Sequence, residues 1–107
     1  MRRYGMTIHL KPEAEVAYAQ HHRSVWPQVI SKITECNIRN YSIFLRDGVL
    51  FSYFEYTGDD FNGDMRRMAE HPETQRWWSM ISPMQVPLES RLEGEWWAPM
   101  VEVFHLD

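Results

Sequence analysis

A chain of 107 residues is the usual size of a single domain, so one domain over residues 1–107 is expected. Its apolar fraction of 44%, with five Trp, five Tyr and five Phe, exceeds what a disordered segment carries and predicts a packed core. The formal net charge of −4 provides no positive surface for nucleic acid or an anionic membrane, and neither is an expected partner.

The expected location of the protein is the cytoplasm. The single Cys36 cannot form an intramolecular disulfide, and Met1-Arg2-Arg3 runs into a short alternating segment instead of the long apolar region of a secretory signal. No window approaches the roughly 20 apolar residues that cross a bilayer as a helix.

The first half of the sequence predicts a strand followed by a broken helix. Apolar side chains alternate with small or polar ones over residues 3–10, as in a half-buried strand. Pro12 suits the first turn of a helix running to about His22. Ser24 can cap a second helical stretch that closes at Asn37, so the helix is expected to break near Arg23.

The second half predicts a hairpin, a helical layer and a last strand. Residues 38–45 and 49–56 are rich in aromatic and branched side chains, and a compact Asp47-Gly48 turn lies between them. A helical segment from Phe61 is interrupted by Pro72 and continues through Ile81. A long connection leads to alternating residues 100–106, which predict a final strand.

The order βαββαβ defines an α+β, ferredoxin-like fold with an antiparallel sheet and helices on one face, of the dimeric α+β barrel type. The other sheet face must also be covered. A second copy packed sheet to sheet is the economical solution at this size, so a homodimer is expected.

Tyr18 and His22 are the first candidates for chemistry, because four residues on a helix place both side chains on one face. An imidazole exchanges protons near neutral pH, and a phenol can orient it or bind a substrate hydroxyl. The alternative is a structural His beside a packing Tyr, and spacing alone favours that alternative.

Each of the two tryptophan pairs could serve either a ligand site or a packing or dimer contact. Trp77 and Trp78 point about 100° apart on a helix, so they cannot both enter one core layer, and one of them is free for a ligand or a dimer interface. Trp96 and Trp97 lie in a loop, where packing or a dimer contact is favoured.

Tyr41 lies on a predicted strand, and two strand carboxylates, Glu55 and Glu102, are costly to bury unless they are paired or face a wet cavity. They are candidate pocket residues, with an ion pair to Arg3 or Arg39 at least as favoured. No zinc-ligand spacing and no nucleotide or serine-hydrolase motif occurs, so no metal and no cofactor is expected.

Five short motifs, taken together, strongly resemble the L-rhamnose mutarotase family in order and over essentially the whole chain. They are Tyr18-x-x-x-His22, Val25-Trp26-Pro27, Asn40-Tyr41-Ser42-Ile43, Gln75-Arg76-Trp77-Trp78 and Glu102-Val103-Phe104. The resemblance implies an isomerase of carbohydrate metabolism with a ferredoxin-like dimer and no cofactor or metal. It further implies that His22 is the proton donor and that Tyr18, Tyr41, Trp77 and Trp78 bind the sugar.

The segment over residues 83–99 is longer and more aromatic than in short family members, so L-fucose or another deoxy-hexose is an alternative to L-rhamnose. The expected reaction is acid–base opening and reclosure of the sugar ring, with His22 protonating the ring oxygen and Glu55, Glu102 or a water as the base. Two other functions stay open: a cofactor-free monooxygenase or isomerase of the same fold, and a non-catalytic sugar-binding module.

Overall fold

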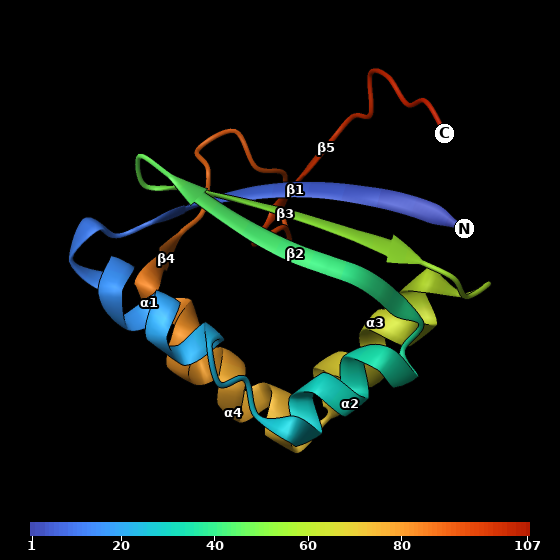
Figure 1. Ribbon diagram of the computed structural model, residues 1–107, viewed down its shortest axis with the longest axis horizontal. Coiled ribbons are helices and arrows are strands. Elements are labelled where there is room, and N and C mark those ends of the chain that lie inside the picture. Colours follow the sequence, from blue (N-terminus) through green and yellow to red (C-terminus); the bar gives the residue numbers. More distant parts are fainter.

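The computed structural model describes all 107 residues. They form one antiparallel sheet that is covered on one face by helices (Figure 1). The strands are β1 (Arg2–Leu10), β2 (Ile38–Arg46), β3 (Val49–Tyr56), β4 (Gln85–Val86) and β5 (Ala98–Met100). Their order is β2-β3-β1-β4, and β5 pairs with the same edge of β1 as β4. This is the predicted ferredoxin-like arrangement, which is confirmed.

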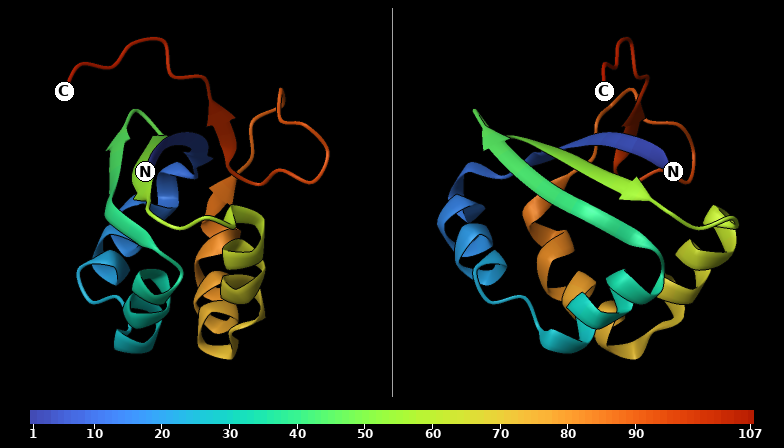
Figure 2. Two further views of the ribbon diagram at one scale, coloured as in Figure 1. Left: turned by 90° about the vertical axis from the view of Figure 1, so that its right-hand side faces the viewer. Right: turned by 45° about the vertical axis from the view of Figure 1, so that its right-hand side comes forward.

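The helical layer contains α1 (Glu15–His22), α2 (Pro27–Glu35), α3 (Phe61–Glu70) and α4 (Pro72–Ile81). Short 3-10 turns precede α1 and follow α4, at Pro12–Ala14 and Ser82–Met84. Figure 2 shows the helices together below the sheet, with the other sheet face left open. None of the helices combines the length and apolar character needed to cross a bilayer.

The predicted break in the first helical region is confirmed, since α1 ends at His22 and α2 begins at Pro27. Ser24 is not the cap, however. Trp26 occupies that position in an extended conformation, with ψ of 134°, because the ring of Pro27 disfavours a helical residue before it and is itself suited to the first helical position.

The last strand differs from the sequence prediction. It covers Ala98–Met100, which pairs with Gly5–Thr7, and the chain then leaves the sheet, so the prediction of a strand over 100–106 is wrong. Alternation predicts a strand only when one side has something to bury against. In this single chain Val101, Val103 and Phe104 are 87%, 94% and 78% exposed.

The interior has two apolar clusters. One contains seven buried side chains from both layers, namely Ile8, Leu10, Tyr18, Val29, Leu50, Trp77 and Ile81. A smaller cluster of Ile38, Phe54 and Tyr56 lies toward α3. Both clusters lie on the sheet face that carries the helices, so the hydrophobic core is on this face.

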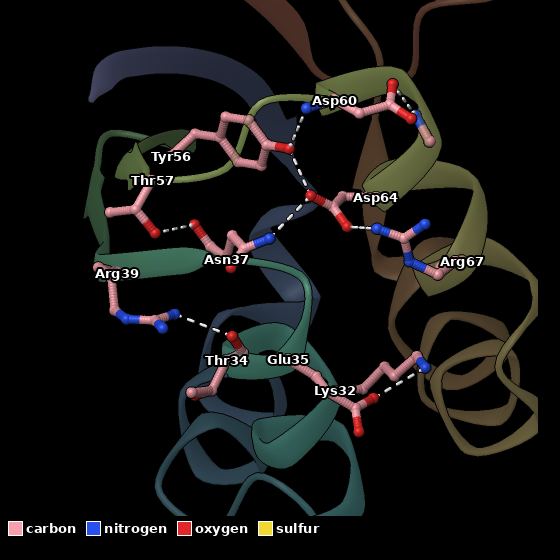
Figure 3. A network of polar contacts seen from close by, with 11 residues as sticks. Lys32, Thr34, Glu35, Asn37, Arg39, Tyr56, Thr57, Asp60, Asp64 and Arg67 are labelled. Atoms are coloured by element: carbon pink, nitrogen blue, oxygen red, sulfur yellow. Dashed lines mark hydrogen bonds and ion pairs between the residues drawn. The ribbon is translucent and has the colours of Figure 1, made fainter.

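A buried polar network fixes the end of the sheet nearest α3 (Figure 3). The carboxylate of Asp64, only 1% exposed, accepts hydrogen bonds from the Tyr56 hydroxyl, from the Asn37 amide at 3.0 Å and from Arg67. The Tyr56 hydroxyl in turn accepts the backbone N–H of Asp60 at 3.1 Å. The network therefore ties the end of β3 and the residue before β2 to the first turns of α3.

Candidate active site

A cavity of about 940 Å³ lies between the sheet and the helices, within the ~300–1,000 Å³ of ordinary ligand pockets. Its walls are mostly apolar. The structure places on these walls all five residues that the family resemblance implies for the site: Tyr18, His22, Tyr41, Trp77 and Trp78. They come from α1, β2 and α4, so the fold gathers side chains up to 60 residues apart around one space.

His22 is the last residue of α1, and its ring is held from two sides. It stacks on the Tyr18 ring with centroids 4.2 Å apart, and Trp77 packs edge-on at 5.3 Å. Nδ1 of His22 lies 2.8 Å from the backbone carbonyl oxygen of Tyr18. Burial lowers the pKa of His22, with His21 adding to that effect and the hydrogen bond to the Tyr18 carbonyl opposing it.

Tyr18 is 4% exposed, and its hydroxyl belongs to a short hydrogen-bonded chain. Gln85 Nε2 donates to the Tyr18 hydroxyl oxygen at 3.1 Å, and Trp96 Nε1 donates to Gln85 Oε1 at 2.7 Å. Burial raises the pKa of Tyr18, and the bond from Gln85 partly offsets the rise. The phenol is therefore kept protonated at neutral pH.

Tyr41 reaches the cavity because β2 is irregular. The β2–β3 register shifts between Arg39 and Ser42, and Asn40 adopts a positive φ of 51°. The Tyr41 ring then packs edge-on against Phe54, 5.6 Å away. Although Tyr41 is 44% exposed, loss of water around its hydroxyl, with a smaller effect of nearby Tyr18, raises its pKa to about 12. Tyr41 therefore lines the cavity while part of its side chain stays in contact with solvent.

The two adjacent tryptophans have different surroundings, as their divergence on a helix requires. Trp77 is 4% exposed and packs against both His22 and Trp26. Trp78 is 39% exposed and lines the cavity from the solvent side. Trp77 thus supports the imidazole, and Trp78 is a partly exposed aromatic residue of the cavity wall.

No carboxylate and no cysteine lines the cavity, and its ionisable groups are Tyr18, His22, Tyr41 and Arg39. Glu55 and Glu102, considered as pocket residues and as the catalytic base, do not line it. Glu102 forms an ion pair with Arg3 at 3.1 Å. Glu55 accepts hydrogen bonds from the Asn40 amide and the Tyr53 hydroxyl. Both expectations of a role in the pocket are wrong, and for Glu102 the ion-pair alternative is confirmed.

Two residues of the site were not predicted to line the cavity: Gln85 had no role assigned from the sequence, and Trp96 was given another role. Gln85 lies in a two-residue strand, 67 positions from Tyr18, and no local pattern signals such a contact. Trp96 was expected in packing or a dimer contact, yet it lines the cavity and bonds to Gln85. Trp97 packs against the larger core cluster, as favoured. The adjacent pair Trp96-Trp97 is an unusual feature of the sequence, but only the folded structure shows that Trp96 lines the cavity.

The fold and the cavity define a class of protein: a small α+β barrel-type domain with a largely apolar pocket that is lined by an imidazole and two phenols. The family is shown by direct comparison. The model of the L-rhamnose mutarotase family matches residues 3–106, and the chain belongs to this family of isomerases.

Individual relatives agree with the family match. An L-rhamnose mutarotase of Sinorhizobium fredii is 31% identical over 109 aligned positions, covering 99% of each chain. The crystal structure of the L-rhamnose mutarotase from Formosa agariphila superposes with a TM-score of 0.78 at 20% identity, covering 100% of both chains. Tetracenomycin F2 cyclase of Streptomyces glaucescens superposes with a TM-score of 0.64 at 17% identity, also over both whole chains. The two structures share the fold.

Proposed function

We propose that this protein interconverts the α and β anomers of L-rhamnose, with His22 as the catalytic residue and Tyr18, Tyr41, Trp77 and Trp78 forming the sugar site. The observation that carries the proposal is the stacked His22–Tyr18 pair on the wall of a largely apolar cavity. The family to which the chain belongs supports the choice of sugar.

The pocket suits the chemistry of a deoxy-sugar. Ring opening requires removal of the proton from the anomeric hydroxyl and delivery of a proton to the ring oxygen, and a His with a neighbouring phenol supplies both functions. Aromatic walls such as Trp78 stack on the C–H faces of a pyranose, and an apolar lining accommodates a methyl group in place of a hydroxymethyl. A cavity of about 940 Å³ also leaves room for related deoxy-hexoses.

Saturation-transfer NMR tests the activity directly, because it measures anomer exchange at equilibrium. L-rhamnose, L-fucose and D-glucose are compared with and without the protein. Acceleration for L-rhamnose above the other two supports the proposal, and a preference for L-fucose reassigns the substrate. Sugar binding without acceleration would indicate a binding module, and no effect on any sugar would contradict a mutarotase function.

We also propose a homodimer formed by the sheet face that carries no helices. The side chains of Phe44, Phe51 and Met100 are 60%, 38% and 42% exposed, and Phe44 stacks on Phe51 across the β2–β3 pair. A β-carbon at Gly5 would touch both Phe51 and Met100, so these side chains share one face. An exposed apolar face of this kind on a sheet is typical of an interface.

The C-terminal segment over residues 101–107 supports the same interface. It rises on the uncovered side of the sheet in Figure 1 and carries the exposed apolar residues Val101, Val103, Phe104 and Leu106. The ion pair between Arg3 and Glu102 fixes its starting point on β1. A second copy facing this sheet would cover the apolar residues of both the sheet and the segment.

A further inference from the structure

We propose that Gln85 and Trp96 determine sugar specificity, by selecting a 6-deoxy-sugar over the same sugar with a hydroxyl group at C6. The inference rests on the proposed function and deepens it, because it assigns the choice of sugar to one part of the cavity. Neither residue is among the five that the family resemblance implies for the site. Their paired side chains are called the Gln85–Trp96 wall below.

Two parts of the chain build the Gln85–Trp96 wall, and both residues line the cavity. Gln85 begins the short strand β4, and Trp96 lies near the end of the connection over residues 87–97. A turn orders this connection directly before Trp96. The carbonyl oxygen of Leu92 accepts the backbone N–H of Glu95 at 3.1 Å, and the backbone N–H of Leu92 donates to the Glu95 carboxylate at 2.9 Å.

The polar atoms of the wall already have partners within the protein. Trp96 Nε1, the one polar atom of an indole, donates to Gln85 Oε1 at 2.7 Å. Gln85 Nε2 donates to the Tyr18 hydroxyl oxygen at 3.1 Å, and the Gln85 side chain is buried. A sugar hydroxyl placed against this wall would lose its water without gaining an equivalent hydrogen bond, which is unfavourable. A methyl group would lose nothing there.

The indole of Trp96 is restrained, although the residue is 42% exposed. The guanidinium carbon of Arg91 lies 5.9 Å from the centre of the indole ring, within the range of a cation–π contact. Arg91 does not itself line the cavity. The contact with Arg91 and the hydrogen bond to Gln85 both oppose rotation of the ring, so its N–H is not free to turn toward a sugar hydroxyl.

The position of the wall next to Tyr18 relates it to C6 of the sugar. Gln85 bonds to the Tyr18 hydroxyl, so a sugar held by Tyr18 also lies beside Gln85. The proposed reaction takes place at C1 and the ring oxygen, beside the stacked His22–Tyr18 pair. In a pyranose the ring oxygen is bonded to C5, which carries C6. The group at C6 therefore lies close to the reacting atoms and within reach of the wall.

The other edge of the sheet offers polar groups to the remaining hydroxyls. Arg39 and Tyr41 line the cavity from β2, at the opposite end of the strand order from β4. Arg39 bonds to the carbonyl oxygens of Thr34 and Ile38 through Nη1, and a guanidinium has further N–H donors. C2 and C3 lie across the pyranose ring from C5 and the ring oxygen. A sugar with C6 at the Gln85–Trp96 wall therefore directs its C2 and C3 hydroxyls toward β2.

L-rhamnose and L-mannose test the selection, because they differ only at C6, where L-mannose carries the hydroxyl. Saturation-transfer NMR at sugar concentrations well below saturation measures the protein-catalysed exchange of each. Wild type is expected to prefer L-rhamnose by about 10- to 100-fold. Both sugars are measured on the same sample, so a partial loss of folded protein leaves this preference unchanged.

Two variants test whether the paired polar atoms cause the preference. Trp96→Phe keeps an aromatic ring but removes the N–H, which leaves Gln85 Oε1 free to accept a bond from the C6 hydroxyl. The preference for L-rhamnose is expected to fall about 3- to 10-fold. The matched control is the double variant Trp96→Phe with Gln85→Met, which has the same ring but no amide oxygen and is expected to recover the preference.

Equal preferences in the single and the double variant would overturn the role of the paired atoms. A wild-type protein that does not prefer L-rhamnose over L-mannose would overturn the selection at C6, and both results leave the mutarotase function intact. No acceleration of either sugar by wild type would overturn the inference together with the proposed function. Contact with the sugar is tested without any variant, since the indole N–H signal of Trp96 should shift in the ¹H–¹⁵N spectrum when L-rhamnose is added. An unshifted signal at saturating sugar would also overturn the inference.

Discussion

The imidazole of His22 lies flat against the phenol ring of Tyr18, 29° from parallel, and its Nδ1 contacts the carbonyl of the same residue. A spacing of four residues on one helix produces both contacts. Tyr18 therefore positions the imidazole with its backbone and supports it with its ring, while its own hydroxyl accepts a hydrogen bond from Gln85. This double contact makes the pair a single unit of the site.

Substitutions of Trp77 and Trp78 should have different effects on stability and on sugar binding. Trp77→Ala removes a buried side chain from the core and is expected to lower the free energy of unfolding by about 3–5 kcal/mol. Trp78→Ala is expected to cost less than about 1.5 kcal/mol, because its side chain is 39% exposed, but to raise the half-saturating L-rhamnose concentration roughly two- to tenfold. Urea unfolding and saturation-transfer NMR measure the two effects, and similar losses of stability in both variants would contradict the assignment.

The buried carboxylate of Asp64 should matter for stability and not for chemistry. Asp64→Ala leaves the Tyr56 hydroxyl and the Asn37 amide without their acceptor, and we expect a loss of about 3 kcal/mol in urea unfolding. The matched control is Arg67→Ala, which removes a 57%-exposed partner and should cost less than about 1 kcal/mol. Equal losses would show that the network does not depend on the donors of Tyr56 and Asn37.

Tyr41 should make the protein less stable at alkaline pH. Its pKa in the folded state, about 12, lies above the ordinary value of 10.0, so the folded protein holds this proton more tightly than the unfolded chain. Its stabilising contribution is complete below pH 10 and is lost as pH rises from 10 toward 12. The partial exposure of the side chain reduces the contribution to about 1 kcal/mol. Urea unfolding from pH 9 to 11 should show a shallower decline for Tyr41→Phe than for wild type, and parallel declines would contradict the prediction.

The proposed dimer depends on the uncovered sheet face. Phe51→Asp places a charge at its centre and is expected to weaken association at least about 30-fold in sedimentation equilibrium. Val16→Asp on α1 is the control, because Val16 is 72% exposed and lies on the opposite layer. A monomeric wild-type protein, or an equal effect of the two variants, would contradict the proposed interface.

The sequence predicted those parts of the site that lie within one element or one short motif. The spacing of Tyr18 and His22 followed from helix periodicity, and the divergence of Trp77 and Trp78 from the angle between neighbours. The role of Gln85 could not be predicted, because its hydrogen-bond partners Tyr18 and Trp96 are 67 and 11 residues away along the chain and no regular pattern links them to it.

The wrong predictions have a common physical origin. Glu55 and Glu102 looked like pocket residues because they interrupt apolar strands, but strand periodicity does not say which face of the sheet carries the cavity. The strand expected over 100–106 alternates correctly, yet a single chain gives its apolar side nothing to cover. Both predictions would have required knowing which part of the protein packs against each face of the sheet.

We propose that His22, on the wall of this cavity, accelerates anomer exchange of L-rhamnose. The most direct test compares wild type with His22→Ala by saturation-transfer NMR at pH 7, after circular dichroism and urea unfolding have shown that the variant is folded. Wild type is expected to accelerate the exchange, and the variant to lose about 10²-fold or more of that acceleration. Equal acceleration by the two proteins would contradict the role of His22, and no acceleration by wild type would contradict the function itself.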